Sequence, residues 1–495
     1  MRKKYILSID QGTTGSRAFV VDQNGKVAAS AYQEFKQYFP RAGWVEHDAS
    51  EIWESVCSVI KQAVKKSKIE KNQITAIGIT NQRETTVLWH RKTSKPAAKA
   101  IVWQCRRTRD ICTQLKKYEP MFRQKTGLVL DAYFSGTKIK WLLDHIKGLR
   151  AKAQKDSVCF GTIDSWLIWK LTGGQAHVTD MTNASRTLIF NINNFKWDTQ
   201  LLRVLNIPPS ILPKVQNSGS VFGHTNNPQS GLPQGIPITA VMGDQQAALY
   251  GQGCYETGTV KNTYGTGCFM VLNTGKKLVH SKGGLLSTIA SDVQGKPIYA
   301  LEGSVFIAGA VIQWLRDQLK IIKKASECEQ FIKGLTDTDG VYFVPAFVGL
   351  GAPYWDSQAK GIICGLTRGA NDRHIVRAAL ESMAYQTKDV FDLMKKELRR
   401  SPRELKVDGG ACENNFLMQF QADMINCKIV RPKNIDSTVM GAAQLAGVVA
   451  GLWKGKRQLD QMQAKDKVFR PQMKEVVRRE LYRGWTQAVK QSRSK

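Results

Sequence analysis

Three features that this 495-residue sequence lacks narrow what it can be: paired cysteines, a long apolar run and an excess of acidic residues. Its ten cysteines are scattered, and none belongs to a Cys-x-x-Cys motif. This spacing argues against a disulfide framework and against a thiolate metal site. The basic N-terminus shows no signal-peptide pattern. We therefore expect free thiols in a reducing cytoplasm.

The longest apolar stretch runs from Val439 to Trp453 and is interrupted by Gln444. It is rich in glycine and alanine, and it is too short to cross a bilayer, which takes about 20 apolar residues. We expect a buried helix here and no transmembrane segment. No long low-complexity segment indicates disorder. The composition, 42% hydrophobic and 23% charged, is typical of a folded soluble protein.

Acidic residues are scarce: 41 Asp and Glu stand against 72 Lys and Arg, which gives a formal net charge of +31. Such a charge can attract nucleic acid or an acidic membrane surface. The basic residues are spread through the chain, however, without an RNA-binding motif or a basic–aromatic stripe. We expect no specific nucleic-acid partner, and a basic solvated surface is the simpler interpretation.

A chain of 495 residues is too long to fold around one ordinary hydrophobic core, so two large domains are expected. Strand patterns alternate with helical ones, which indicates an α/β architecture. We place the domains at residues 1–252 and 253–495, with the boundary among the glycines at 251–253. Strands are predicted within residues 1–30, and at 74–80, 85–89, 236–242 and 405–411. Helices are predicted at 49–68, 247–250, 301–320 and 375–398, and from about 414.

The segment from Tyr5 to Asp22 predicts a β-hairpin with an unusual tip. An apolar run ends in Asp10, continues into Gly12-Thr13-Thr14-Gly15, and returns through Arg17. Glycines let backbone N–H groups approach an anion, hydroxyls add donors, and a carboxylate can hold a metal ion through water. The tip therefore suits phosphate and Mg²⁺. A turn Asp that caps its own backbone is the alternative for Asp10.

A second strand–turn–strand pattern, at residues 260–272, partly repeats the first. Its turn contains Thr263-Tyr264-Gly265-Thr266-Gly267, again with small residues and hydroxyls. Two related turns in one chain indicate two related domains that close on one nucleotide.

These segments together resemble glycerol kinases, within the FGGY family of carbohydrate kinases, over roughly residues 4–490. The motifs that carry the resemblance occur in family order along the chain. They are DQGTT (10–14), GITNQRE (78–84), WQCRR (103–107), YFSGTK (133–138), GDQQ (243–246), NTYGTG (262–267), GLGAPYWD (349–356), GLTRG (365–369) and VDGG (407–410).

The resemblance implies two ribonuclease-H-like domains of the actin and hexokinase ATPase type, with the active site in the cleft between them. It implies phosphorylation of glycerol by ATP, with Mg²⁺ as the metal, to give glycerol 3-phosphate and ADP. It also implies a cytoplasmic homodimer or homotetramer. The rival interpretations are a family member that acts on a pentose or another polyol, and a noncatalytic nucleotide-binding protein.

By the resemblance, Asp10 holds Mg²⁺ through water, and the rest of the first turn contacts the nucleotide phosphates. The residues implied in that contact are Thr13, Thr14, Gly15 and Arg17. Many relatives carry Ser where this chain has Gly15. The backbone N–H survives that change but one hydroxyl donor is lost, so a modestly weaker nucleotide affinity is expected.

Asp244 is the candidate general base, because it follows an apolar strand and precedes a helix, which directs a carboxylate into the cleft. The alternative for this residue is a helix N-cap, which Asp favours. A base here need not deprotonate an alcohol fully, since it accepts the proton as the O–P bond forms.

A glycerol site must hydrogen-bond three hydroxyls, because a buried polar group left unpaired is costly. The resemblance places Arg83, Glu84, Tyr133 and Gln245 around glycerol together with Asp244, and makes Trp103 and Phe269 an apolar wall. The alternative for Arg83 and Glu84 is a surface ion pair. For the two aromatic residues it is the core.

The second domain supplies the rest of the nucleotide site by resemblance. Thr266 is implied at the γ-phosphate, and four residues at the adenine and ribose: Gly309, Gln313, Gly410 and Asn414. Close helix packing is the alternative for Gly309, and a tight turn for Gly410.

Regulation is expected to differ from that of some bacterial relatives. Those bind fructose 1,6-bisphosphate through an arginine in a Gly-rich loop, and the corresponding residues 230–237 contain no arginine. The segment 470–482 is also unlike the one that some relatives present to a sugar-transport regulator.

Overall fold

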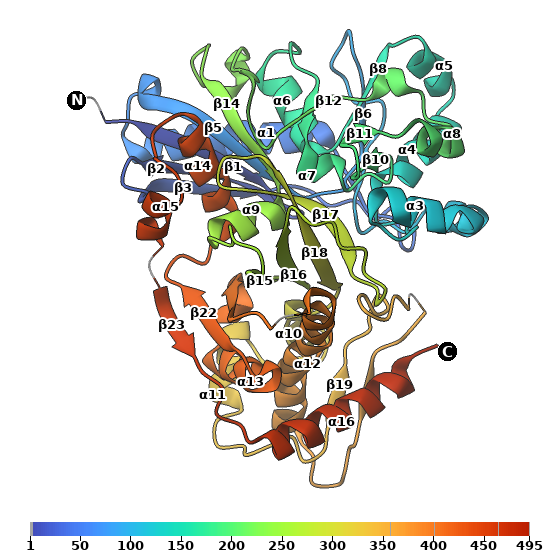
Figure 1. The fold of residues 1–495 in the computed structure, drawn as a ribbon, viewed down its shortest axis with the longest axis vertical. Helices are drawn as coiled ribbons and strands as arrows, with labels where there is room; N and C mark the ends of the chain where they lie inside the picture. The colour runs from blue at the N-terminus through green and yellow to red at the C-terminus, as the bar shows by residue number, and fades with distance from the viewer. Residues whose placement is uncertain (1–2, 357, 400, 464, 495) are drawn as a thin grey trace.

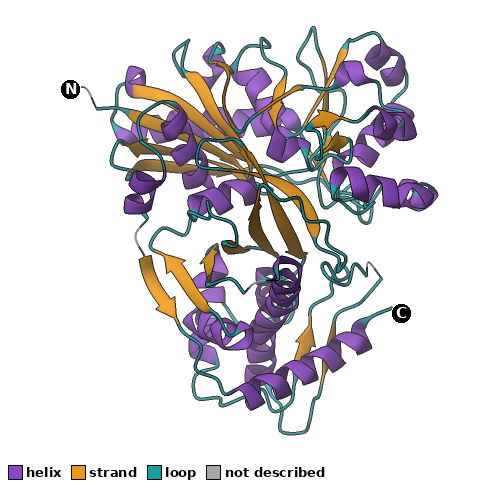
Figure 2. Ribbon diagram, in the orientation of Figure 1, coloured by secondary structure: helices purple, strands orange, loops and turns teal. Residues whose placement is uncertain are grey.

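The chain folds as two α/β halves, each built on one large sheet (Figures 1 and 2). The computed structural model describes residues 3–356, 358–399, 401–463 and 465–494. A six-stranded sheet has the order β13-β14-β5-β1-β2-β3, and a seven-stranded sheet the order β17-β18-β16-β15-β21-β22-β23. We call residues 3–251 the first half and the chain from Val260 onward the second half.

The first sheet contains β1 (Tyr5–Gln11), β2 (Gly15–Asp22), β3 (Val27–Glu34), β5 (Ile74–Asn81), β13 (Gly219–His224) and β14 (Pro237–Gly243). The second contains β15 (Val260–Tyr264), β16 (Cys268–Gly275), β17 (Leu286–Ser291), β18 (Pro297–Val305), β21 (Glu404–Asp408), β22 (Lys428–Pro432) and β23 (Lys465–Phe469). The remaining strands form two-stranded sheets: β4 (Glu46–His47) with β7 (Ala100–Ile101), β6 (Val87–His90) with β8 (Val158–Gly161), β9 (Val178–Asp180) with β12 (Lys214–Gln216), β10 (Phe190–Asn191) with β11 (Lys196–Trp197), and β19 (Tyr342–Val344) with β20 (Ile362–Cys364).

The two large sheets share one pairing pattern. In the first, β1 pairs antiparallel with β2, β2 antiparallel with β3, β1 parallel with β5, and β5 parallel with β14. In the second, β15 takes the place of β1, with β16 and β18 on its antiparallel side and β21 and β22 on its parallel side. The partial sequence repeat at residues 260–272 therefore reflects a repeated fold, and the predicted two-part α/β architecture is confirmed.

Helices cover the sheets (Figure 2). In the first half they are α1 (Ala49–Ser67), α2 (Arg109–Gln114), α3 (Glu119–Thr126), α4 (Ser135–His145), α5 (Leu149–Gln154), α6 (Ile163–Leu171), α7 (Met181–Ala184), α8 (Thr199–Leu205) and α9 (Asp244–Gly251). In the second half they are α10 (Gly309–Asp317), α11 (Cys328–Phe331), α12 (Asp372–Leu398), α13 (Asn415–Ile425), α14 (Ser437–Val449), α15 (Lys456–Met462) and α16 (Glu475–Ser492). The predicted helices at 49–68 and 375–398 correspond to α1 and α12.

The helix predicted at residues 301–320 is wrong in its first part. Residues 301–305 belong to β18, which lies between β17 and β16, and the helix α10 begins at Gly309. A strand that pairs on both sides and is buried on both faces shows no alternation of apolar and polar residues. Residues 301–305 therefore carry no local signal of a strand, and their pairing with β16 and β17 decides the structure.

The chain returns to the first half near its end. α14 lies against β1, β5, β14 and α9, and the red α14 and α15 stand beside the blue strands in Figure 1. Apolar residues of α14, Trp453 and Leu459 share one cluster with residues of the first sheet. The predicted buried helix at 439–453 corresponds to α14, which ends at Val449; residues 450–453 lie outside the helix. The domain limits 1–252 and 253–495 remain a prediction, since residues 437–462 pack on the first sheet.

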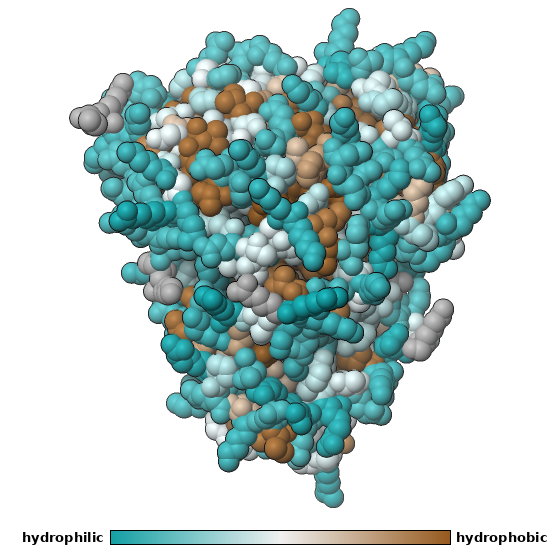
Figure 3. Space-filling view, viewed as in Figure 1, coloured by the Kyte–Doolittle hydropathy of each residue, from teal (hydrophilic) through white to brown (hydrophobic). Residues whose placement is uncertain are grey.

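The face seen in Figure 3 is largely hydrophilic, with smaller apolar areas between hydrophilic side chains. Among the described residues, no helix is both long and apolar enough to cross a membrane.

Glycines bring α14 unusually close to α9. A Cβ atom at Gly441 would lie 1.9 Å from the carbonyl oxygen of Ala247, and one at Gly251 would lie 2.0 Å from that of Ser437. Backbone cannot yield as a side chain can, so we expect Gly441→Ala to destabilise the fold by about 1–3 kcal/mol or more. Thermal unfolding measures this. The control is Gly369→Ala, where a Cβ meets nothing closer than 3.6 Å; equal melting temperatures of the two variants would contradict the prediction.

Candidate active site

Three cavities lie around the turn between β15 and β16. Each is named for the ligand group that its lining residues are predicted to bind. The acceptor cavity measures about 150 Å³, the phosphate cavity about 240 Å³ and the nucleotide cavity about 510 Å³. Thr263 lines both the acceptor and the phosphate cavity, and Gly265 and Thr266 line both the acceptor and the nucleotide cavity. The turn between β15 and β16 is thus common to the whole site.

Strand pairing explains why the polar residues gather here. β1, β5 and β14 run parallel, and the register aligns Gln11 with Asn81 and Asn81 with Gly243. The carboxyl ends of parallel strands meet at one edge of a sheet, which is where α/β proteins bind ligands. Asp10, Arg83 and Asp244 stand at these strand ends. The second sheet also brings polar residues together at the ends of parallel strands, since Thr263 of β15 is aligned with Asp408 of β21.

The acceptor cavity brings together all seven residues predicted to surround the acceptor. Its lining includes Arg83, Glu84, Trp103, Tyr133, Asp244, Gln245 and Phe269. Thr13, which was expected at the phosphates, also lines this cavity, and its Oγ1 accepts a hydrogen bond of 2.9 Å from Trp103 Nε1.

Asp244 is the first residue of α9, and Gly243 before it is the N-cap. The N-cap alternative for Asp244 therefore does not apply. Its Oδ1 accepts a 2.7 Å hydrogen bond from the backbone N–H of Gln245 and lies 3.0 Å from Arg83 Nε in an ion pair. The side chain keeps 31% exposure. No described residue donates to Oδ2, so one carboxylate oxygen is available to a ligand.

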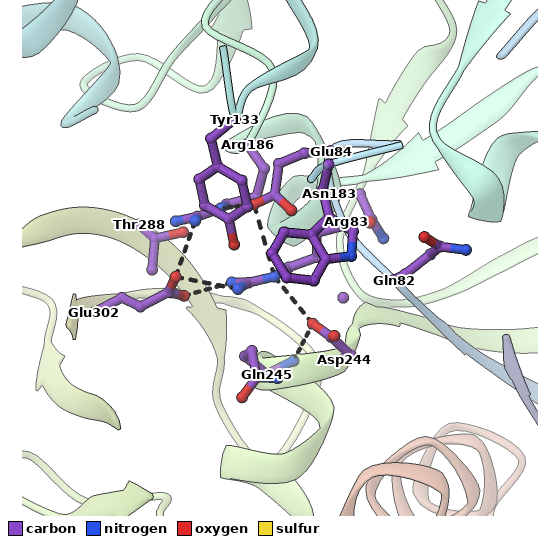
Figure 4. A network of polar contacts seen from close by, with 12 residues as sticks. Gln82, Arg83, Glu84, Tyr133, Asn183, Arg186, Asp244, Gln245, Thr288 and Glu302 are labelled. Atoms are coloured by element: carbon purple, nitrogen blue, oxygen red, sulfur yellow. Dashed lines mark hydrogen bonds and ion pairs between the residues drawn. The ribbon is translucent and has the colours of Figure 1, made fainter. Parts of the chain in front are cut away.

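Arg83 and Glu84 are both almost fully buried, which excludes the surface ion-pair alternative. Figure 4 shows Arg83 extended between Asp244 and Glu302. Its Nη1 and Nη2 donate to Glu302 at 2.5 and 3.1 Å. Glu84 has a left-handed backbone (φ 61°), and its Oε1 accepts a 2.6 Å bond from Arg186 Nε.

Two residues of this network, Arg186 and Glu302, are absent from the sequence-based prediction. Arg186 Nη2 donates to Glu302 Oε1 at 2.9 Å, so two arginines and two glutamates form one closed, buried set. Burial alone would raise the pKa of Glu302, but Arg186 and Arg83 bring it down to about 2. A glutamate inside an apolar strand segment was the available signal, because a buried carboxylate needs a partner.

Lys138 is a third residue that sequence analysis did not single out for a role. It is fully buried, and its Nζ donates to the carbonyl oxygens of Tyr133 at 2.6 Å and Glu84 at 3.2 Å. It thereby ties the two main-chain segments that carry acceptor-cavity residues. Burial lowers the pKa of Lys138 to about 7.

Aromatic rings form one side of the acceptor cavity. Trp103 makes edge contacts with Tyr133 at 5.7 Å and with Phe269 at 6.2 Å between ring centroids. Trp103 and Phe269 are partly exposed and line the cavity, and Trp103 also packs against a cluster of buried apolar residues. Burial raises the pKa of the Tyr133 phenol, which keeps it a hydrogen-bond donor.

The phosphate cavity contains Asp10, Thr14, Gly15 and Arg17, as predicted for the first turn. Burial raises the pKa of Asp10 to about 7; Arg17 lowers it, and Asp244 and Asp436 raise it further. No described residue donates a hydrogen bond to the Asp10 carboxylate, which leaves no support for the backbone-cap alternative. A half-buried carboxylate near other carboxylates suits a hydrated Mg²⁺ that also binds phosphates. No group of three potential metal ligands occurs among the described residues.

The nucleotide cavity is lined by all five residues predicted for it: Thr266, Gly309, Gln313, Gly410 and Asn414. A Cβ atom at Gly309 would lie 2.6 Å from the carbonyl oxygen of Gly265, so close contact with the turn explains that glycine. At Gly410 a Cβ would meet nothing within 4 Å. Gly410 therefore opens space in the cavity, and Asn414 caps α13 through its Oδ1.

Gly15 has a local explanation in Tyr32. A Cβ atom at Gly15 would lie 2.6 Å from the Tyr32 ring and its hydroxyl. Tyr32 also lines the phosphate cavity, and its ring lies 5.5 Å from the Arg17 guanidinium carbon. The phenol thus occupies the space that a side chain at position 15 would take.

This contact predicts coupled effects of Gly15→Ala and Tyr32→Ala. Gly15→Ala displaces the Tyr32 ring and should weaken ATP binding several-fold, as measured by titration calorimetry. With the ring removed the clash disappears, so Gly15→Ala should add little in a Tyr32→Ala background. The same loss in both backgrounds would show that Tyr32 is not the reason for the glycine.

Comparison with known proteins agrees with this geometry. The chain is 56% identical to glycerol kinase of Carboxydothermus hydrogenoformans over 495 residues, which cover 100% of this chain and 99% of that one. It is 55% identical to glycerol kinase 2 of Thermotoga maritima, over 99% of each chain. The crystal structure of Plasmodium falciparum glycerol kinase with ADP superposes with a TM-score of 0.91 at 37% identity, covering 99% of this chain and 98% of that one.

The family models match both halves. The N-terminal domain of the FGGY family of carbohydrate kinases matches residues 5–251, and the C-terminal domain matches residues 260–450. The first matched region contains the six-stranded sheet, and the second contains every strand of the seven-stranded sheet except β23. This chain therefore belongs to the FGGY family of carbohydrate kinases.

Proposed function

We propose that this chain transfers the γ-phosphoryl group of ATP to a hydroxyl of glycerol, giving glycerol 3-phosphate and ADP. The observation that carries the proposal is the shared turn of residues 263–267. It separates a small polar cavity that holds Asp244 from a larger cavity of cofactor size. Pockets for drug-sized ligands measure about 300–1,000 Å³, so the acceptor cavity suits a much smaller molecule.

In the proposed reaction Asp244 acts as general base. The acceptor oxygen bonds to the γ-phosphorus, the bond from that phosphorus to the β–γ bridging oxygen breaks, and ADP leaves with the electron pair. The hydroxyl proton passes to the carboxylate of Asp244. Arg83 holds Oδ1 at 3.0 Å, which fixes the carboxylate and leaves Oδ2 toward the cavity. Positioning of this kind supplies most of the catalysis in phosphoryl transfer.

Acceptor choice follows from the chemistry of the cavity. Arg83 and Tyr133 are donors, Glu84 is an acceptor, and the aromatic rings cover carbon. A substrate without one of the three hydroxyls leaves a buried group unpaired, which such sites reject strongly.

Mg²⁺ is the metal that the proposal requires. Asp10 would hold it through water beside the phosphates, where the metal supplies charge neutralisation during transfer. Thr14, Gly15 and Arg17 would bind the phosphates, and Gln313, Gly410 and Asn414 the adenosine. We further propose that closing of the two halves excludes water and limits hydrolysis of ATP.

The cellular setting is carried over from the family as part of the proposal: a cytoplasmic enzyme that assembles as a homodimer or homotetramer. The arginine-free segment 230–237 remains the reason to expect no control by fructose 1,6-bisphosphate.

An acceptor panel tests the proposed activity. ADP release is followed in a coupled assay with glycerol, dihydroxyacetone, xylulose, ribulose and gluconate at equal concentration. We expect glycerol to give the highest kcat/KM by a wide margin. A preference for any of the three sugar acceptors would overturn the assignment of glycerol.

The base assignment predicts that Asp244→Asn loses nearly all phosphorylation while Mg·ATP still binds. The amide keeps the size of the side chain but cannot take the proton, and removal of such a group typically costs about 10²–10⁴-fold in rate. Coupled kinetics and calorimetric titration with ATP measure the two effects. A kcat near that of the wild type would rule out Asp244 as the base.

A further inference from the structure

Lys261 is a buried lysine on β15 whose contacts all lead to the acceptor cavity. Its side chain is inaccessible to solvent, and its Nζ donates to Gln245 Oε1, to Thr263 Oγ1 at 2.8 Å and to the carbonyl oxygen of Phe269 at 3.1 Å. All three partners line the acceptor cavity. Three acceptors match the three N–H groups of an ammonium, so this buried charge is fully satisfied.

The contact with Gln245 joins the two halves of the protein. Gln245 belongs to α9 of the first half, and Lys261 to β15 of the second. Burial lowers the pKa of Lys261 to about 8, while Asp408, Asp244 and Glu302 favour its charged form against burial and the nearby Arg83. Their attraction is what allows a lysine to remain an ammonium donor at this depth.

The lysine also determines which end of the Gln245 amide faces a ligand. An ammonium has donors only, so it can meet the amide only through Oε1. Nε2 then remains, and no described residue accepts a hydrogen bond from it. Since Gln245 lines the cavity, its NH₂ group is the end available to the acceptor. Beside it, Asp244 offers a carboxylate oxygen, so a donor and an acceptor stand next to each other.

We propose that Lys261 is a specificity-determining positioning residue, which selects a polyol acceptor by fixing the Gln245 amide with its NH₂ group toward an acceptor hydroxyl oxygen. A hydroxyl can accept from Gln245 Nε2 while another group accepts its proton. An acceptor without that hydroxyl leaves the NH₂ unpaired. The inference deepens the proposed function and rests on it.

Lys261→Met tests the proposal, because methionine keeps the apolar stem and removes all three donors. Gln245 is then free to turn, and we expect KM for glycerol to rise about 10- to 100-fold. We expect kcat and KM for ATP to stay near the wild-type values. Direct titration of glycerol, followed by tryptophan fluorescence because Trp103 lines the cavity, should show the same loss. An unchanged KM for glycerol, or an equal rise in both KM values, would overturn the proposal.

The matched control is Lys406→Met. Lys406 is aligned with Lys261 on the neighbouring strand β21, and its Nζ donates to the carbonyl oxygen of Gln252 at 2.6 Å, away from the acceptor cavity. We expect no change in KM for glycerol in this variant. A rise as large as that of Lys261→Met would mean that removing any lysine of this sheet has the effect.

A double-mutant cycle with Gln245→Leu separates positioning from general support of the fold. If Lys261 acts through the amide, Lys261→Met adds little to KM for glycerol once Gln245 is Leu. Independent, additive losses would contradict the mechanism.

Deoxy analogues give the sharpest readout. Wild-type protein should favour glycerol over both propane-1,2-diol and propane-1,3-diol. Lys261→Met should reduce the preference for glycerol over one of these diols more than over the other. Equal loss toward glycerol and both diols would indicate a merely structural role. Should Lys261→Met fail to fold, Gln245→Glu keeps the Lys261 contact but replaces NH₂ by oxygen, and the same loss is expected.

The outcome is distinguishable from failure of the proposed function. Wild-type protein without glycerol-dependent ADP release would refute the function itself. Wild-type activity with unaltered acceptor preference in Lys261→Met and Gln245→Glu would refute only the role of Lys261.

Discussion

The site depends on one buried arrangement of charge, in which Arg83 and Arg186 of the first half share Glu302 of the second. Removing ions from water costs several kcal/mol each, and only close, well-aligned partners offset this. Glu302 meets both guanidinium groups, and Glu84 balances the remaining positive charge. The position of Arg83, and through it that of Asp244, is therefore set by residues from both halves. The acceptor cavity exists only where the two sheets are held together in this way.

The repeated sheet explains how one site can serve two substrates. Each sheet has a central strand with an antiparallel neighbour and a parallel neighbour, and each turn after the central strand lies at the same edge. The first turn carries Asp10 and the phosphate-facing groups, and the second separates acceptor from nucleotide. In-line transfer requires that both substrates approach one point from different directions. Two copies of one fold, facing each other, provide those directions without any special loop.

Much of the fold and of the candidate site could be predicted from the sequence, because the sequence patterns that indicate them are local. Asp10 lies at the end of an apolar run and Asp244 directly follows one, and α1 and α12 show plain helical spacing. Glu302, Arg186 and Lys261 could not be placed, since each acts through a partner on the opposite half or on a distant strand. The error at residues 301–305 has the same origin: β18 is a strand because β16 and β17 flank it. Gly15 likewise makes sense only through Tyr32 on the neighbouring strand. Short motifs identify residues such as Asp10 and Asp244, whereas the charge balance between the halves depends on tertiary contacts.

The strong positive charge and the acidic character of the cleft are complementary. The chain carries a net charge of +31, and its phosphate cavity holds Asp10, Asp408 and Asp436 beside Arg17. Asp408 is buried; burial raises the pKa of its carboxyl, and Lys261 lowers it. A basic surface attracts anions such as ATP over long range and raises their local concentration. Inside the cavity Arg17 attracts a phosphate, whereas the carboxylates repel it at short range when they are ionised. In the proposed function the nucleotide arrives with Mg²⁺, and that cation would offset the repulsion between its phosphates and these carboxylates.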